Sequence, residues 1–261
     1  MNISLSGKQA LVCGSTQGIG LAIAKELAVC GANCILMARD EEALKKAVQG
    51  LDRNNQQKHE YLVADFSDPD KVQEVINNFI QTTIVHVLVN NSGGPKFGPL
   101  IEEEGQKFVD AFKQHVVCNQ LLAKAVVPGM KSSGYGRIIN IISTSVRIPI
   151  INLGVSNTIR AAVASWSKSL ANEIGGSGIT VNNILPGFTS TNRLKALLES
   201  TAAKRGVEIE QVAKEMKERI PLKRFGEPAE TAAVAAFLAS PAASYVNGVS
   251  IPVDGGGTGT I

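Results

Sequence analysis

The feature that most constrains this chain is a strand-like apolar run that ends in a cluster of glycines. Leu11 to Cys13 leads directly into Gly14, Gly18 and Gly20, and an apolar pattern of helical character then continues to Ala28. This order predicts a strand, a tight turn and a helix. Glycines allow positive φ angles and close approach of a ligand, and the free N–H groups at a helix start attract phosphate. The turn therefore indicates pyrophosphate binding, although its spacing departs from the usual Gly-x-Gly-x-x-Gly fingerprint and a plain strand-to-helix connection would look the same.

Short apolar runs alternate with helical patterns along the rest of the chain. The strand-like runs cover residues 33–38, 61–64, 85–89, 137–142, 180–185 and 249–253, and the helical patterns cover 41–48, 68–82, 102–131, 156–174 and 227–239. Such alternation builds a parallel sheet with helices on both faces. A chain of 261 residues with 44% hydrophobic residues can bury one large core. We therefore expect an α/β fold, a doubly wound parallel sheet in a single domain.

The segment from about residue 191 to 222 does not fit this alternation. It is charged and helical from Asn192 to Arg219, without the dense apolar pattern of the other helices. We interpret it as a helical insertion that forms a lid over a substrate. Its Lys and Arg residues outnumber its acids, which would suit an anionic substrate or carrier, but a solvated helix face is the stronger explanation.

Composition argues against several kinds of partner. The net charge is only +3, and no block of Lys and Arg is interleaved with aromatic residues, so we expect no nucleic-acid binding. No apolar stretch approaches the roughly 20 residues needed to cross a bilayer, and Met1 to Lys8 lack the features of a signal peptide. These observations predict a cytoplasmic protein that does not bind membranes. The four cysteines have no neighbouring histidine to complete a zinc site, so we predict no metal.

Several short motifs occur in an order that resembles one known family. They are Gly14-x-x-x-Gly18-x-Gly20, Asp65 after the third strand, Asn90-Asn91-Ser92-Gly93, Ser143 after the fifth strand, Pro186-Gly187 with Thr191, and Val253-Asp254-Gly255-Gly256. Together they span nearly the whole chain and resemble the short-chain dehydrogenases/reductases, in particular the branch that includes 3-oxoacyl-acyl-carrier-protein reductases. The resemblance implies a Rossmann fold with a nicotinamide dinucleotide lying across the carboxyl ends of the strands.

The resemblance also assigns cofactor contacts to individual residues. The glycines of the turn would admit the pyrophosphate, with the hydroxyls of Ser15 and Thr16 donating hydrogen bonds to it. Asp65 would accept from the adenine amino group, Asn91 would fix the adjacent ribose region, and Thr191 would anchor the carboxamide. The Asn-Asn pair could equally form a turn that uses its tolerance of left-handed geometry, and both roles are compatible. The complete set of implied cofactor contacts is Gly14, Ser15, Thr16, Gly18, Ile19, Gly20, Arg39, Asp65, Phe66, Asn91, Ser92, Gly93, Arg160, Pro186, Gly187 and Thr191.

The end of the second strand bears on the choice of cofactor. An acid there would bind a ribose 2′-hydroxyl and repel a 2′-phosphate, but Ala38 occupies the position in the family register and Arg39 follows it. A guanidinium suits a phosphate, so the sequence predicts NADP rather than NAD. Two features argue against NADP. Gln17 stands where many NADP-using members carry a second basic residue, and Asp40 could pair with Arg39.

The expected catalytic residues depart from the family pattern. Ser143 is retained, but the register places Ser156 and Arg160 where most members have a tyrosine and a lysine, and His115 where they have an asparagine. Ser156 and Arg160 are four residues apart and would share one face of a helix. Arg160 could hold the ribose and place positive charge where an alkoxide develops, but it cannot donate a proton near neutral pH. His115 is then the only candidate general acid, and a histidine that merely bonds a carbonyl is the favoured alternative.

Two functions are compatible with these features. The first is an NADP-dependent oxidoreductase that reduces a small-molecule carbonyl compound, such as a 3-oxoacyl thioester, with unusual proton delivery. The alternative is a dinucleotide-binding protein without redox activity, acting as a sensor or a partner subunit. The resemblance also implies a homotetramer built on the helices at 102–131 and 156–174, although the composition of these helices equally allows burial within one subunit.

Overall fold

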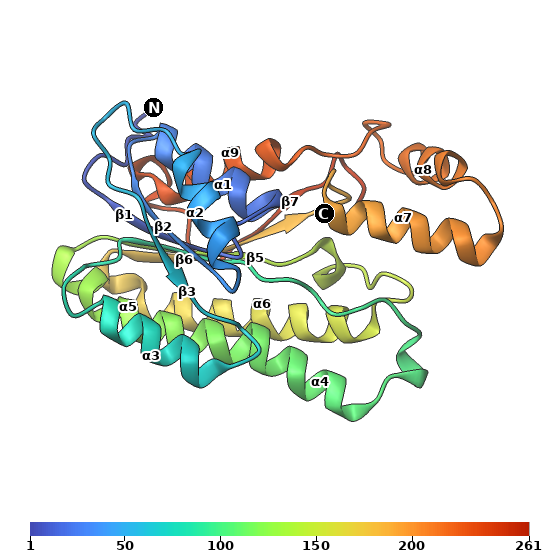
Figure 1. The fold of residues 1–261 in the computed structure, drawn as a ribbon, viewed down its shortest axis with the longest axis horizontal. Coiled ribbons are helices and arrows are strands. Elements are labelled where there is room, and N and C mark those ends of the chain that lie inside the picture. The colour runs from blue at the N-terminus through green and yellow to red at the C-terminus, as the bar shows by residue number, and fades with distance from the viewer. Residues whose placement is uncertain (261) are drawn as a thin grey trace.

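The computed structural model describes residues 1–260 and contains one sheet of seven parallel strands (Figure 1). The strands are β1 (Gln9–Cys13), β2 (Asn33–Ala38), β3 (Glu60–Val63), β4 (Val87–Asn90), β5 (Gly136–Ile141), β6 (Ile179–Pro186) and β7 (Ser250–Val253). Their order across the sheet is β3-β2-β1-β4-β5-β6-β7. The direction of winding reverses between β1 and β4, and ligands of doubly wound sheets bind at the carboxyl ends of the strands at such a point.

Helices cover both faces of the sheet, and each layer encloses a separate apolar core. One face carries α1 (Gly18–Val29), α2 (Glu41–Gln49) and α9 (Pro228–Ala239), and the other carries α3 (Pro69–Phe79), α5 (Cys118–Ser133) and α6 (Gly154–Ile174), with α4 (Gly105–Phe112) alongside. Figure 1 shows the first group above the sheet and the second below it. Leu27 and Leu238 are fully buried in the first core, and Ile76 and Leu122 are fully buried in the second. The prediction of a doubly wound α/β sheet in a single domain is confirmed.

Two of these helices begin where the sequence places a capping carboxylate. Asp40 accepts a hydrogen bond from the backbone N–H of Ala43 at 3.0 Å, and Asp68 accepts from that of Lys71 at 3.0 Å. Each bond satisfies an N–H group that the first helical turn leaves without a partner. Asp40 therefore serves α2 as its cap.

Four polar side chains, three of them buried, form a row from β4 to the edge strand β7. Asn90 donates to Asn140 at 2.8 Å, Asn140 donates to Asn183 at 3.0 Å, and Asn183 donates to Ser250 Oγ at 3.0 Å. The four residues are register partners on β4, β5, β6 and β7. A slip of one residue would leave buried amides without partners, which is costly. The row therefore fixes the level at which these strands end beside the cleft.

The helix predicted over residues 102–131 is interrupted. Leu100–Glu102 forms a separate 3-10 turn before α4, and a π-helical segment, Lys113–Val117, lies between α4 and α5. The wider π turn places His115 in the interior, where it is only 2% exposed. Apolar spacing did not distinguish this segment from regular α-helix, because both bury one face. Segments of this kind occur frequently at functional sites.

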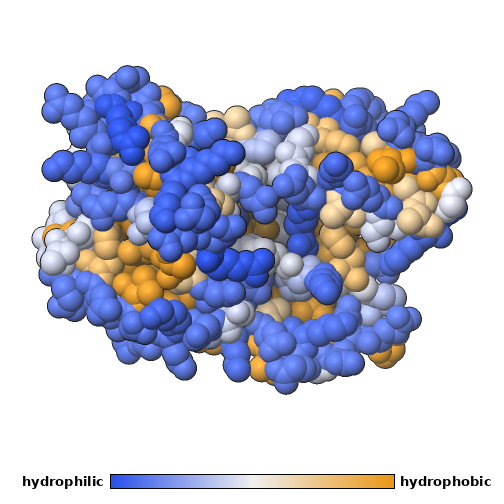
Figure 2. Space-filling view, viewed as in Figure 1, coloured by the Kyte–Doolittle hydropathy of each residue, from blue (hydrophilic) through white to orange (hydrophobic). Residues whose placement is uncertain are grey.

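The predicted lid segment forms two helices, α7 (Asn192–Arg205) and α8 (Ile209–Glu218), which extend beyond the edge where the strands end (Figure 1). They enclose a small apolar cluster that contains Leu194, Leu198, Ala202 and Val212. The segment therefore has a core of its own, which the sequence prediction missed. Figure 2, viewed as in Figure 1, shows a hollow near the middle of the molecule and apolar side chains exposed over the lid helices.

Within residues 1–260, no helix has the length and apolar content needed to cross a membrane.

Candidate active site

The glycine turn between β1 and α1 has a geometry that only glycine fits. Gly14 and Gly18 have φ angles of +56° and +55°, in the left-handed region that side chains rarely adopt. A Cβ on Gly14 would lie 2.6 Å from the carbonyl oxygen of Asn91, and one on Gly20 would strike the carbonyl oxygen of Gly14. Asn91 in turn donates through Nδ2 to the carbonyls of Cys13 (3.2 Å) and Gly14 (3.0 Å). The turn is therefore packed against the end of β4, and the first N–H groups of α1 remain free for an anion.

The two hydroxyl residues of this turn differ in position. Ser15 is fully buried, and its Oγ has no hydrogen-bond partner among residues 1–260. Thr16, the next residue of the turn, is half-exposed. The expected hydrogen bonds of both hydroxyls to the pyrophosphate stay predictions.

A second group of predicted residues lies where β2 and β3 end. The side chain of Arg39 is 79% exposed, and its Nη1 lies 3.9 Å from the Oδ2 of Asp65. Asp65 accepts from the backbone N–H of Ser67 at 2.9 Å, which lowers the pKa of the carboxyl. Phe66 is buried behind it, 7% exposed. The pairing of Arg39 with Asp40 that weighed against NADP does not form, because Asp40 caps α2.

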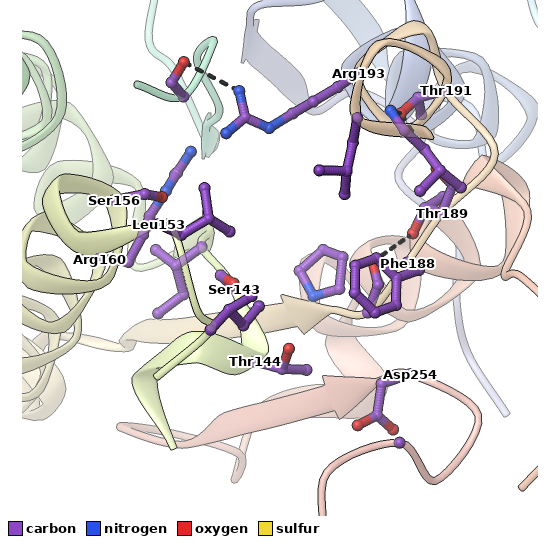
Figure 3. A pocket seen from close by; sticks show the side chains of 18 of the residues that line it. Ser143, Thr144, Leu153, Ser156, Arg160, Phe188, Thr189, Thr191, Arg193 and Asp254 are labelled. Carbon is purple, nitrogen blue, oxygen red and sulfur yellow. Dashed lines mark hydrogen bonds between the residues drawn. The ribbon is translucent and has the colours of Figure 1, made fainter. Parts of the chain in front are cut away.

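Ten of the predicted residues line one cleft of about 370 Å³ at the carboxyl edge of the sheet (Figure 3). Figure 3 shows Ser156 and Arg160 on one side, Thr191 on the opposite side, and Ser143 between them. The cleft lies at the topological switch point, where the doubly wound fold binds its ligands. The ten residues are Ile19, Asn91, Ser92, Gly93, Ser143, Ser156, Arg160, Pro186, Gly187 and Thr191.

Ser143 follows β5 and begins the short 3-10 turn Thr144–Val146. Its Oγ accepts a hydrogen bond from the backbone N–H of Ser145 at 3.1 Å. Because that contact uses a lone pair of the oxygen, the hydroxyl hydrogen remains available for donation into the cleft. The local turn thus orients Ser143 as a donor.

Arg160 is held beside the same strand end. Its Nη1 donates to the carbonyl oxygen of Ile141 at 2.9 Å, which keeps the guanidinium close to the segment that carries Ser143. Burial and the nearby Arg193 lower the pKa of Arg160 to about 10, so the group is a cation at neutral pH. Ser156 is 6% exposed and lies one turn earlier on α6.

His115 lies behind the cleft wall. Its Nδ1 is 2.8 Å from Ser92 Oγ, and its Nε2 has no partner among residues 1–260. Burial, with the charges of Arg160 and Arg193, lowers the pKa of His115 to about 2. The imidazole is therefore neutral at physiological pH, which argues against the expected role as an imidazolium acid. The alternative, a bond to a carbonyl, is also not what the structure shows, because the partner is a serine hydroxyl.

The sequence analysis predicted a lid at 191–222 but did not name the individual residues with which the lid and the loop after β4 line the cleft. Arg193 is two residues beyond the predicted Thr191, and this position in the first turn of a lid helix was an available signal. Phe188 directly follows the predicted Pro186-Gly187 motif, but an apolar residue beside a motif does not by itself indicate that its side chain faces a cleft. The additional lining residues include Phe97, Ile150, Leu153, Phe188, Arg193, Leu197, Met216 and Arg219.

The sheet order, the glycine turn and the cleft at the switch point define a dinucleotide-binding protein of the doubly wound α/β class. A family model described as Enoyl-(Acyl carrier protein) reductase matches residues 14–258. The chain therefore belongs to the short-chain dehydrogenase/reductase family, as the sequence motifs predict.

Similar proteins match along nearly the whole chain. The 3-oxoacyl-acyl-carrier-protein reductase FabG of Vibrio cholerae is 34% identical over 257 residues, which cover 97% of this chain and 98% of that protein. Gluconate 5-dehydrogenase of Gluconobacter oxydans is 31% identical and covers 97% of this chain and 95% of that protein. Among solved structures, L-sorbose reductase from Gluconobacter frateurii, complexed with NADPH and L-sorbose, superposes with a TM-score of 0.94 at 32% identity, covering 100% of both chains. These similarities confirm the predicted oxidoreductase class.

Proposed function

We propose that this protein is an NADP-dependent reductase of a small-molecule carbonyl compound. The observation that carries the proposal is the meeting of Ser143 and Arg160 in one cleft at the carboxyl edge of the sheet, where Ile19 of the glycine turn also lies. An aligned hydroxyl donor and a fixed cation are the groups that stabilise an oxygen on which negative charge develops. The relatives are named as reductases and dehydrogenases of carbonyl or alcohol compounds, which supports the same reaction class.

The residues present fit NADP. The glycine turn and the start of α1 would take the pyrophosphate, and the exposed Arg39 would take the 2′-phosphate. The cofactor prediction is confirmed by related structures that contain NADPH. From the family register, Asp65 would hold the adenine, Asn91 and Arg160 the ribose regions, and Thr191 the carboxamide. The remaining cleft residues, including Ser92, Gly93, Pro186 and Gly187, would form the walls around the nicotinamide half.

Bound NADPH supplies a hydride, which goes to the carbonyl carbon of the substrate. Ser143 donates a hydrogen bond to the carbonyl oxygen, and Arg160 places its charge beside the same oxygen as the alkoxide develops. Ser156 replaces the family tyrosine and is too weak an acid to give up a proton by itself, so it positions a water that supplies the proton. A neutral His115 then acts through Ser92, as a positioning residue behind the cleft wall.

The function can be tested by following NADPH absorbance with a panel of oxo acids, 3-oxoacyl thioesters and ketoses. We expect turnover with at least one of these classes, and loss of that turnover in Arg160→Leu. Tight NADPH binding without oxidation of NADPH by any member of the panel would instead support the alternative function, a dinucleotide-binding protein without redox activity.

We propose in addition that α7 and α8 act as a lid and that the protein forms a cytoplasmic homotetramer. For the tetramer, the support is the partial exposure of Leu121, Ala125, Ala162 and Ala164 on α5 and α6, together with the exposure of Val109 (47%) and Phe112 (45%) on α4. In the family these helices pair across a two-fold axis. Light scattering at micromolar concentration should give a tetrameric mass, and a monomeric mass would remove the proposal.

A further inference from the structure

Three guanidinium groups line the cleft, from Arg160 on α6, Arg193 on α7 and Arg219 just after α8. Within residues 1–260, none of them forms an ion pair with a carboxylate. The acidic lining residue Asp254 is occupied by its own turn, because its oxygens accept from two backbone N–H groups at 3.0 and 2.8 Å. The cleft therefore has more positive charge than its own side chains neutralise, and an anion that enters it would be stabilised.

Arg193 is held in a fixed position at the cleft. Its Nη1 donates to the carbonyl oxygen of Gly94 at 3.0 Å, and its Nη2 donates to that of Pro95 at 3.1 Å. The guanidinium also lies over the ring of Phe97, 5.1 Å from its centre. A Cβ on Gly94 would come within 2.9 Å of Nη2, so the close fit depends on that glycine. Two carbonyls use two of the five N–H donors of an arginine, which leaves the others for a ligand.

The geometry separates Arg193 from the expected cofactor contacts. Its neighbour Asn192 donates to the side chain of Gln17 in the glycine turn at 2.9 Å, and Thr191 lies against Gly18 of the same turn. Arg193 is directed the other way, toward the loop after β4, and Figure 3 shows its side chain extending across the opening. At the start of α7, Thr191 and Asn192 thus face the expected cofactor side, and Arg193 faces the opposite wall of the cleft.

The wall around Arg193 is largely apolar. It is formed by residues of α7, of α8 and of the segments that follow β5 and β6. The neutral polar side chains of the cleft come mainly from the ends of β4, β5 and β6 and from the start of α6. A ligand that fits this wall has a hydrocarbon body and one anionic end. The apolar residues concerned are Ile150, Leu153, Phe188, Leu197 and Met216.

We propose that the substrate is an oxo acid with an apolar body, whose carboxylate is bound by Arg193 while its carbonyl faces Ser143 and Arg160. This inference rests on the proposed reductase function. A hydride from NADPH forms the new C–H bond at the carbonyl carbon, the C=O π bond breaks, and a proton from water completes the hydroxyl group. The products are a hydroxy acid and NADP⁺, and the carboxylate itself does not react.

The test compares aliphatic oxo acids, which differ in the separation of carbonyl and carboxylate, with their methyl esters. For the preferred acid, kcat/KM should exceed that of its ester by about 10- to 100-fold, the usual range for charge-assisted hydrogen bonds. Arg193→Leu should remove this difference by lowering kcat/KM much more for the acid than for the ester. Arg193→Lys should retain part of the preference, because it keeps the charge without the planar fork.

A matched control is Arg205→Leu, at the far end of the same helix, where Arg205 pairs with Glu215 at 2.7 Å. This variant should keep the preference of the wild type. Equal kcat/KM for acid and ester in the wild type, or an equal loss for both in Arg193→Leu, would overturn the proposal in favour of a lid contact. A fall in NADPH affinity of the same size in Arg193→Leu would assign the residue to the phosphates of the cofactor.

Two further measurements separate the oxo-acid proposal from a contact with a carrier arm and from failure of the reductase function. Thioesters of pantetheine with and without its phosphate are compared, and an Arg193-dependent preference for the phosphorylated form, without one for oxo acids, would overturn the proposal in favour of a carrier arm. Calorimetric binding of oxo acid and ester to the protein with NADP⁺ needs no turnover. If no substrate is reduced but the acid binds more tightly in an Arg193-dependent way, the reductase function fails and the carboxylate site stands.

Discussion

The region expected to bind the cofactor and the region expected to carry catalysis differ in how closely they follow the family pattern. At the ends of β1, β2 and β3, the glycine turn, Arg39 and Asp65 keep the residue types expected for a dinucleotide site. On the side of β5 and α6, only Ser143 is kept, while Ser156 and Arg160 replace the tyrosine and lysine. Ile19 of the glycine turn lines the same cleft as Ser143, Ser156 and Arg160, whereas Arg39 and Asp65 are not among the lining residues.

This contrast indicates which parts of the chemistry tolerate replacement. The glycine turn has no room for side-chain atoms at Gly14 or Gly20, so its function depends on backbone shape. In the proposed mechanism, the catalytic side depends on charge and hydrogen-bond donors, which other residue types can supply. Arg160 can stabilise an alkoxide without giving up a proton, provided that water delivers the proton.

Gly14→Ala should have the largest effect, because it damages both the fold and the cofactor site. The substitution forces a side chain into the left-handed region, at φ +56°, and places a Cβ 2.6 Å from the Asn91 carbonyl. We expect a loss of about 2–4 kcal/mol in the free energy of unfolding and more than about 100-fold in kcat/KM. Chemical denaturation and NADPH titration measure the two losses. The control Gly50→Ala, where the nearest atom would be 3.6 Å away, should change neither, and a fully active Gly14→Ala would refute the role of the turn.

Arg160→Leu should lower kcat/KM by about 100-fold, the usual cost of losing one stabilising group for a developing oxyanion. Stability should change little, because the substitution also removes the repulsion between the Arg160 and Arg193 guanidinium groups. Steady-state kinetics and thermal unfolding separate the two effects. Arg160→Lys should keep most of the activity, and normal activity in Arg160→Leu would exclude the cation from the reaction.

Arg39→Ala should lower NADPH affinity by about 10-fold and leave NADH affinity unchanged. The guanidinium is exposed and loosely paired, so its contact with a 2′-phosphate is partly screened by solvent. Fluorescence titration with both cofactors measures the change. An unchanged preference would place the 2′-phosphate elsewhere.

His115→Asn should have the smallest effect on activity, less than about threefold, since a neutral histidine provides no general-acid factor of about 10²–10⁴. Its effect on stability depends on pH. The pKa of His115 is lowered to about 2 in the folded protein, so the unfolded chain takes up a proton first as the pH falls below about 6.5. The wild type should therefore lose about 2 kcal/mol more than the variant between pH 7 and pH 5.

Denaturation at the two pH values checks this prediction. The double variant Ser92→Ala/His115→Asn removes both partners of the hydrogen bond and serves as the control for its loss. An activity loss of 100-fold or more in His115→Asn, with the fold intact, would restore the histidine as a proton donor.

The parts of the molecule that could be predicted from sequence are those where local chemistry determines structure. Glycine spacing identified the turn, and apolar alternation identified the strands and the layers of the fold. The position of His115 could not be read in this way, because the π-helical segment has the same apolar spacing as an α-helix. Arg193 was missed because its partners, Gly94 and Pro95, are nearly 100 residues away in sequence and meet it only through the packing of the lid.

The central claim is that NADPH reduces a carbonyl compound in this cleft without a side chain that titrates near neutral pH as the acid. The pH dependence of the single-turnover rate of NADPH oxidation tests it most directly. We expect the rate to stay constant within about twofold from pH 6 to pH 9. It should fall only as the pH approaches the pKa of Arg160, about 10. The pH profile of His115→Asn should have the same shape. A rate that falls about tenfold per pH unit above a midpoint near 6.5, and no longer does so in His115→Asn, would contradict the account.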